Sequence, residues 1–324
     1  MATDELSFKT LSAARDREKS VPLTLVTGPD GFKAVAYRCI LNEDNDGAPT
    51  CYGPEDIIPS AIEPLRYATN HANWVFSATN HNFEWHAVVN RTKPQADAEA
   101  AAHKPPRWKI DPNPALQDRF QRFPVVKQSG GARGYYVSTT SLLAHPGREE
   151  WEQERYFNAV DDPYAALTPP LVRQSVSLGD YGLAVRAESG TSQGFIFADS
   201  GNENKVGEVS RKLFRTFFPR ANQEGNDVIF LVFPGSGAGL SGISGIKTAL
   251  FRQMTKLSQA SNADDLILRF AHPEIWDFLS TSEKLRDKDP DFGDRYRNIL
   301  SALRDRGYRP RMGDFPVQRA PATA

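Results

Sequence analysis

The sequence predicts a mainly β protein with a long irregular insertion and a C-terminal helical extension. Short runs rich in Val, Ile, Phe and Tyr, each bounded by turn residues, concentrate between positions 134 and 234. Beyond about position 241 the apolar residues recur instead at helical spacing. The strand-like runs are Tyr135–Val137, Tyr181–Val185, Gly194–Ala198 and Val228–Phe233.

The first part of the chain predicts an arm followed by a hairpin. Residues 1–20 are charged and rich in Ala and Ser, so we expect a short helix or a loose arm there. Two β-favouring runs, Leu23–Val26 and Ala34–Tyr37, flank the turn sequence Gly28–Gly31. The main β domain is therefore expected over 21–240.

An insertion at about 53–133 interrupts this domain. It is rich in Pro, Asn and aromatic residues, with a brief helix expected at Ala96–Lys104. A structureless loop of that length is unusual, so part of it should pack on the main body as short elements. Three of its aromatic residues would suit either stacking on sugar rings or a satellite core: Trp74, Trp85 and Trp108.

The second half predicts one turn and two helices. Glu188–Ser192 would turn one strand-like run into the next, and Ser210 would cap a helix that continues to Phe218. The extension over 241–324 is expected to begin as a helix and to end as a disordered Pro/Ala tail. The residues that give this helical spacing are Ile246, Leu250, Met254 and Leu257.

Composition excludes several classes of partner. The 39 Lys and Arg residues nearly balance the 40 Asp and Glu residues, so no field of one sign would attract nucleic acid or an anionic membrane. No run approaches the roughly 18 apolar residues of a membrane helix, and the N-terminal residues lack a secretory signal pattern. We expect no nucleic-acid or membrane partner, a monomer, and a cytoplasmic location or export by a non-classical route.

Two acidic residues stand at the ends of predicted rigid elements. Asp199 directly follows an apolar strand, and Glu208 directly precedes the helix capped by Ser210. Hydrolysis of a glycosidic bond needs two carboxyl groups, one protonated and one ionised, on opposite sides of the bond. The residues alone equally allow a turn-forming Asp199 and a Glu208 that complements the helix dipole.

The surroundings of these acids carry a family resemblance. Asp-Ser-Gly at 199–201 is followed by Lys-Val-Gly-Glu-Val-Ser at 205–210, and Asp-Asn-Asp-Gly stands at 44–47. Further segments in the same order are 134–142, 160–164, 180–185 and 228–236, although Thr168 separates Leu167 from Pro169 where the family has Leu-Pro. Together these segments resemble glycoside hydrolase family 75, the bacterial and fungal chitosanases.

The resemblance implies an endo-acting hydrolase of β-1,4-linked amino-sugar polysaccharide, chitosan first. We expect no cofactor and no metal. The acids that match Asp199 and Glu208 are the essential pair of that family, and its inverting reaction implies carboxyl groups roughly 6.5 to 9.5 Å apart. We assign Glu208 as acid and Asp199 as base, with the reverse assignment left open. The matching segment at 134–142 implies substrate contacts from Thr140 and Ser141.

The same carboxylate segment suggests a fold by analogy. A strand, Asp-x-Gly, a short loop, acid-x-Ser and a helix are similar to the pattern of double-psi β-barrels. A small six-stranded barrel of this kind leaves one open groove for an extended sugar chain.

Chitosan is cationic, so a cleft lined by carboxylates should favour it. Glu43, Asp44 and Asp46 are the expected lining. The same residues also fit a solvated turn or a cation loop, although the full calcium-loop spacing with a terminal Glu is absent. All three interpretations stay open.

Other candidate sites lack the required spacing. The Gly-rich run 234–248 misses the Gly-Lys-Ser/Thr step of a phosphate-binding loop, and His71, His81 and His86 lack the spacing of a zinc site. Cys39 and Cys51 could form one bridge in an oxidising compartment but are expected as thiols in a cytosol. The alternatives to the hydrolase are a non-catalytic carbohydrate-binding or structural module and a peptidoglycan-active toxin or lysis protein.

Overall fold

The structure is a computed structural model in which the main β domain and the start of the C-terminal extension are described. The expected helix at Ala96–Lys104, Trp108, the histidines His71 and His81, and the tail 271–324 lie outside the described residues. The described residues are 4–16, 19–54, 61–65, 74–79, 82–87, 125–126, 130–132, 135–186, 191–201, 205–220, 228–262, 266 and 269–270.

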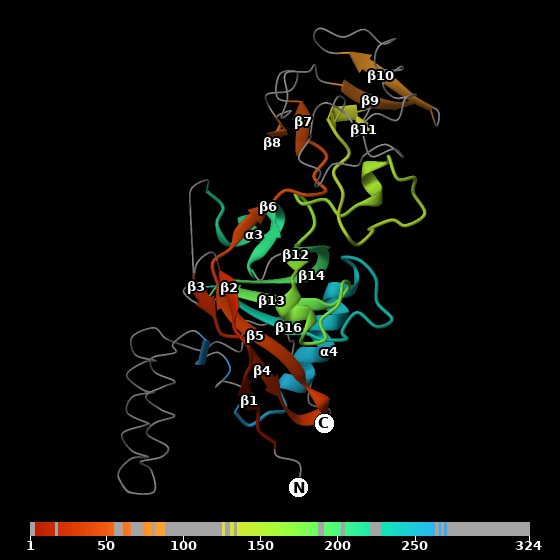
Figure 1. Cartoon of the computed structure of the whole chain (residues 1–324). Coiled ribbons are helices and arrows are strands. Elements are labelled where there is room, and N and C mark those ends of the chain that lie inside the picture. The colour runs from red at the N-terminus through yellow and green to blue at the C-terminus, as the bar shows by residue number, and fades with distance from the viewer. Residues whose placement is uncertain are drawn as a thin grey trace, which may run out of the picture.

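One mixed sheet of nine strands dominates the molecule (Figure 1). The protein is therefore mainly β, as the sequence predicts. In spatial order the strands are β1 (Ser7–Thr10), β4 (Thr24–Thr27), β5 (Lys33–Cys39), β16 (Val228–Phe233), β13 (Tyr181–Arg186), β14 (Ser192–Ser200), β12 (Tyr164–Leu167), β15 (Glu208–Ser210) and β6 (Asn42–Asp44).

Smaller sheets accompany it, two of them formed wholly or mostly within the insertion. β2 (Ala14–Asp16) pairs with β3 (Lys19–Val21), and β7 (Tyr52–Pro54) pairs with β8 (Glu63–Leu65). Trp74 and Trp85 lie on the paired strands of a third sheet, so the insertion does contain short elements. That sheet comprises β10 (Asn82–Ala87), β9 (Trp74–Thr79) and β11 (Val125–Val126).

The nine-stranded sheet has an apolar core on each face. β16 reads Val-Ile-Phe-Leu-Val-Phe and is buried along its whole length, as expected for a strand covered on both sides. α3 (Arg211–Phe217) packs its apolar residues with Phe195, Phe197 and Phe230 on one face. α4 (Gly245–Leu257) packs against β13 and β14 on the other face (Figure 1). The two helices thus confirm the helical spacing around positions 213 and 250.

The sheet curves strongly because β5 and β6 are joined by only Ile40 and Leu41. β5 is third in the spatial order and β6 is ninth, yet consecutive residues cannot be far apart. The sheet must therefore bend back until its last strand lies near its third. Among the described strands no ladder pairs β6 with β5, so the structure shows a curved sheet and not a closed barrel.

Several predicted elements can be compared directly. Both predicted hairpins are confirmed, β4 with β5 and β13 with β14, and Ser210 accepts a hydrogen bond from the Leu213 amide as the cap of α3. The expected N-terminal helix is wrong where the arm is described, because β1 pairs with the edge of β4. Of the predicted run Tyr135–Val137 only Tyr136 forms a β-bridge, so the run is not a strand. The short elements η1 (Pro29–Gly31), η2 (Gly130–Ala132), η3 (Gln153–Arg155) and α2 (Pro169–Val172) complete the described helices.

Asp180 explains the Gly-rich run as a structural turn. Its carboxylate is 3% exposed and accepts hydrogen bonds from the amides of Ser177 (2.9 Å), Gly235 (3.1 Å) and Gly237 (3.0 Å). A Cβ on Gly237 would lie 2.5 Å from the carbonyl oxygen of Gly179, so no other residue fits there. These amides serve the fold, which leaves them unable to cradle a phosphate.

We expect Asp180→Ala to lower the free energy of unfolding by about 2 to 3 kcal/mol, because three backbone amides lose the buried carboxylate that accepts from all of them. Denaturant unfolding measures the change. Glu150→Ala removes an exposed acid and should change stability by less than about 0.5 kcal/mol. Equal stability of the two variants would contradict this role for Asp180.

Candidate active site

Asp199 owes its direction to a β-bulge in β14. Ala165 on β12 pairs with Phe197, but the next residue, Ala166, pairs with Asp199, so Ala198 is an extra residue in the ladder. Strict alternation would place Asp199 on the face of Phe195 and Phe197, inside the apolar core. The bulge instead turns Asp199 onto the opposite face, which it shares with Ala166.

The register brings Glu208 onto that same face. Ala165 also pairs with Val209 on β15, and continuing this antiparallel register places Ala166 opposite Glu208. Asp199, Ala166 and Glu208 therefore form one row across three strands. Neighbouring strands lie about 4.8 Å apart, so the backbones of the two acids are separated by about 10 Å. The sequence pair is thus brought together across a single intervening strand.

The Glu208 carboxylate reaches back toward the strand of Asp199. A Cβ built on Gly201 would lie 3.3 Å from Glu208 Oε2 and 3.1 Å from Thr168 Cγ2. Glu208 is exposed, whereas Thr168 is buried. The side chain therefore leans over β12 and remains open to solvent.

Asp199 is partly buried and held by three donors on one oxygen. Its Oδ1 accepts hydrogen bonds from the Ser141 amide (3.0 Å), the Ser141 hydroxyl (2.7 Å) and the Ser200 amide (2.8 Å). Burial raises the pKa of the Asp199 carboxyl above its ordinary value of 3.8, although these hydrogen bonds act in the opposite direction. Oδ2 receives none of the three donors.

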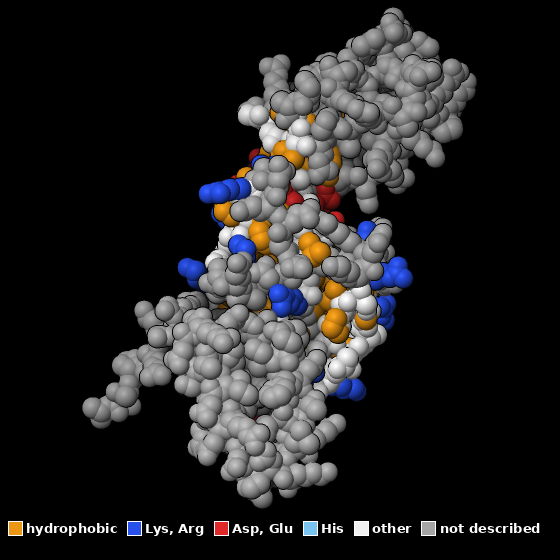
Figure 2. All heavy atoms as spheres, turned by 90° about the vertical axis from the view of Figure 1, so that its left-hand side faces the viewer, with side chains coloured by type: hydrophobic (Ala, Val, Ile, Leu, Met, Phe, Trp, Pro, Cys, Tyr) orange, Lys and Arg blue, Asp and Glu red, His pale blue; other side chains and the backbone are white. Residues whose placement is uncertain are grey.

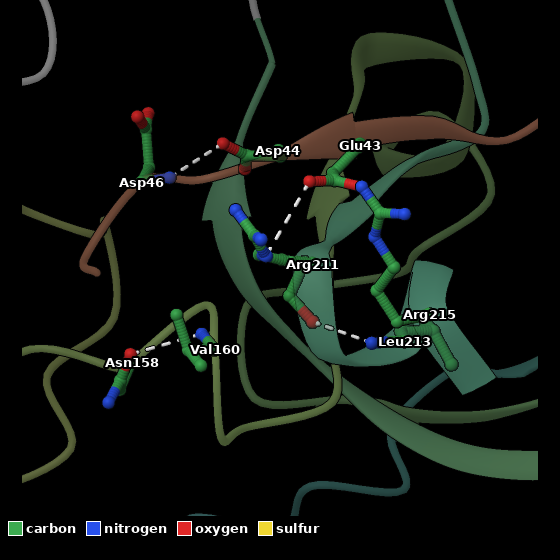
Figure 3. A network of polar contacts seen from close by, with 9 residues as sticks. Glu43, Asp44, Asp46, Asn158, Val160, Arg211, Leu213 and Arg215 are labelled. Carbon is green, nitrogen blue, oxygen red and sulfur yellow. Dashed lines mark hydrogen bonds and ion pairs between the residues drawn. The ribbon is translucent and has the colours of Figure 1, made fainter. Parts of the chain in front are cut away.

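Asp44 and Asp46 lie beside Asp199. Each of these three acids has a carboxylate oxygen within 4.8 Å of the others. The Asp46 amide donates to Asp44 Oδ1 at 2.9 Å, which fixes the turn after β6 (Figure 3). Among the described residues this group could offer three oxygen ligands to a cation, fewer than the six to eight that calcium takes.

Two tyrosines that the sequence analysis did not single out as site residues hold this turn. The Tyr52 hydroxyl donates to Asp46 Oδ1 at 2.5 Å, and the Tyr164 hydroxyl donates to the Asp46 carbonyl at 2.6 Å. Burial, followed by the charges of Asp44, Asp199 and Asp46, raises the pKa of Tyr164 well above its ordinary value. Tyr164 therefore stays a neutral donor. Tyr164 stands in a quoted segment, but nothing in its spacing shows that it meets Asp46.

Glu43 is not brought to this acidic group. Neighbouring residues on a strand point to opposite faces, so Glu43 leaves β6 on the other side from Asp44. Its carboxylate forms ion pairs with Arg215 Nη2 at 2.8 Å and Arg211 Nε at 3.8 Å (Figure 3). Glu43 thus ties β6 to α3.

Of the two predicted substrate-contacting residues, only Ser141 contacts the acidic group. Ser141 contacts Asp199 directly, as described above. Thr140 is 6% exposed, and its hydroxyl donates to the Leu142 carbonyl while it accepts from the Phe157 amide. Cys39 and Cys51 are both buried, belong to different apolar clusters and are not joined by a disulfide, so the bridge considered from the sequence is not formed.

Figure 2 shows how the charged side chains of the described residues are distributed on one face. In the face drawn in Figure 2, the described Lys and Arg side chains are scattered, while acidic ones gather near the upper end of the described body. No helix among the described residues is long and apolar enough to cross a membrane.

We expect Asp199→Asn to change how stability depends on pH. The folded parent binds the Asp199 proton more tightly than the unfolded chain, so this proton stabilises the parent at low pH. That contribution is lost as the pH rises from about 3.8 through the raised pKa. The unfolding free energy of the variant, minus that of the parent, should therefore increase across this range. A difference that stays flat or falls in denaturant titrations at a series of pH values would contradict the raised pKa.

Comparison with known proteins does not identify a family for this chain. A scan against protein-family models gives no match, and neither does a search of curated proteins. The likeness to the chitosanase family rests on the sequence segments alone.

Proposed function

We propose that this chain is a glycoside hydrolase that cleaves β-1,4-linked amino-sugar polysaccharides, chitosan first, by an inverting mechanism. The observation that carries the proposal is the row of Asp199, Ala166 and Glu208, which sets two acids on one face of the sheet with one strand between them. An acid and a base must act from two sides of the scissile bond.

The separation of the pair favours inversion over retention. Their backbones are about 10 Å apart, and Glu208 leans toward β14, so the gap between the carboxyl groups is expected within the roughly 6.5 to 9.5 Å of inverting enzymes. A retaining pair would stand about 5 Å apart. The intervening residue, Ala166, has a small side chain and adds little bulk between the two acids.

The environments of the two acids suggest the reverse of the roles assigned from the sequence. A general acid must hold its proton at working pH, and the raised pKa of the Asp199 carboxyl meets that need. Its proton belongs on Oδ2, because Oδ1 already accepts three hydrogen bonds. Exposed Glu208 is then the base that activates water.

The acidic group supports a cationic substrate. Asp44 and Asp46 place negative charge beside Asp199, where the ammonium group of a glucosamine unit would be attracted. This assigns substrate binding to Asp44 and Asp46 and not to Glu43, whose charge is paired with α3.

The curvature of the sheet supports a small barrel of the double-psi type that the carboxylate segment suggests by analogy, although the curved series contains seven strands and not six. The two-residue link between β5 and β6 brings the two ends of the strand series β5, β16, β13, β14, β12, β15 and β6 near one another. In such a barrel, the row of acids would lie along one groove.

The proposal is tested by incubating the purified protein with chitosan, chitin oligomers and peptidoglycan. We expect chitosan cleavage, with Asp199→Asn and Glu208→Gln each on the order of 100- to 10,000-fold slower, because each removes one proton-transfer group. Glu149→Gln, at an exposed acid, is the matched control and should retain the parent rate. NMR of the first product should show the α-anomer.

Both variants cutting at the parent rate would refute the proposed pair. Tight oligosaccharide binding without any product would point to a binding module. Release of muropeptides alone would point to a peptidoglycan-active protein.

The assignment of the two roles has its own test. A chito-oligosaccharide with a nitrophenolate leaving group needs no protonation when its bond breaks, so loss of the general acid matters less. We expect the defect of Asp199→Asn to shrink at least about tenfold on this substrate, while that of Glu208→Gln persists. The opposite pattern would restore Glu208 as the acid.

A further inference from the structure

Gln153 is a buried amide that bonds to two separate segments of the chain. It lies at the start of η3 and is 3% exposed. Its Nε2 donates to the carbonyl oxygens of Gly47 (2.9 Å) and Ser138 (2.6 Å), and its Oε1 accepts from the Ser138 amide (2.9 Å). The side chain therefore uses both of its donor hydrogens and its acceptor on backbone groups.

A fourth hydrogen bond joins the two segments that Gln153 contacts. The Gly47 amide donates to the Ser138 hydroxyl at 2.8 Å, so Gly47 and Ser138 are joined both directly and through Gln153. Gly47 has a φ of +76°, and a Cβ there would lie 1.8 Å from the carbonyl oxygen of Phe157. The turn at Gly47 therefore packs closely against the segment that follows η3.

The two segments that Gln153 joins carry opposite halves of the acidic site. Gly47 directly follows Asp46, whose oxygen lies within 4.8 Å of Asp199. Ser138 begins the segment that reaches Ser141, which donates twice to Asp199 Oδ1. The amide touches none of the three acids, yet it connects the backbone that carries two of them to the backbone that holds the third.

We propose that Gln153 is a positioning residue of the acidic site, which fixes the 44–47 turn against the 138–142 segment and thereby sets Asp44 and Asp46 beside Asp199. Its effect on turnover rests on the proposed hydrolase function, whereas its effect on the backbone does not. Neither asparagine nor glutamate reproduces these contacts. Asparagine is one methylene shorter, and an ionised glutamate would present only acceptors to two carbonyl oxygens.

The test compares Gln153→Ala with Asn262→Ala in the full chain. Asn262 is a matched amide far from the site, because its Oδ1 accepts from the Leu6 amide (2.6 Å) and its Nδ2 donates to the Leu6 carbonyl (3.3 Å). Both variants lose an amide that bridges distant backbone segments. Ser138→Ala is the second site variant, since it removes the bond from Gly47 and leaves Gln153 in place.

Hydrogen exchange of single amides gives a readout that needs no substrate. The Ser141 amide bonds to Asp199 and the Asp46 amide bonds to Asp44, and neither bonds to Gln153. We expect both to exchange at least about tenfold faster in Gln153→Ala, with a smaller change in Ser138→Ala and none in Asn262→Ala. A merely structural amide would change only its own partner, Ser138, together with the neighbouring Gly47.

Kinetics on chitosan give the second readout. Gln153→Ala displaces the substrate-binding Asp44 and Asp46 relative to Asp199, so we expect its kcat/KM to fall on the order of 100-fold, while kcat/KM of Asn262→Ala stays at the parent value. An unchanged kcat/KM, or unaltered exchange at Ser141 and Asp46, would overturn the proposal. If Gln153→Ala does not fold, the kinetics and the hydrogen exchange of Ser138→Ala decide the proposal in the same way. If the parent protein cleaves no polysaccharide, the hydrolase proposal fails while the exchange experiment still decides the role of Gln153.

Discussion

The single extra residue in β14 determines which environment the Asp199 carboxylate meets. Without the bulge at Ala198, alternation would direct Asp199 among Phe195 and Phe197, where an unpaired charge would cost several kcal/mol. With the bulge, the carboxylate meets Ser141 and Ser200 as donors and remains on the face of β12 that Glu208 also borders. The acidic group and the row of acids both follow from this local shift of register.

The supports of Asp199 show how a partly buried acid is tolerated beside two others. Three donors stabilise Oδ1 of Asp199, and the Tyr52 hydroxyl donates to the carboxylate of Asp46. These bonds do not cancel the cost of burial, since the pKa of Asp199 still lies above its ordinary value. A proton retained on Asp199 also reduces repulsion within the group, so stability and a proton-donating role favour the same state.

Sequence reasoning reached the parts of this site that depend on local pattern. The placement of Asp199 and Glu208 near one another was predictable because a strand, a turn and a capped helix surround them. The grouping of Glu43 with Asp44 and Asp46 was wrong, because no strand was expected at Asn42–Asp44, where neighbouring side chains point to opposite faces. The bulge, Tyr52 and Gln153 were not predictable, since each acts through contacts between segments far apart in the chain. The N-terminal arm shows the same limit. Its polar residues give no strand period, and edge pairing with β4 decides its structure.

The position of β12 between the two acids has a consequence for how the pair is held. Only nine positions separate Asp199 from Glu208 in the sequence, yet the chain leaves β14, passes beyond β12 and returns antiparallel to it as β15. The spacing of the pair is therefore set by two strand ladders and not by the connecting loop. Gly201 lets the start of that connection pass close to Thr168 and Glu208, because a Cβ there would crowd both side chains. Rigid strands thus fix the acid pair, while the turn that carries Asp44 and Asp46 depends on side-chain hydrogen bonds for its place.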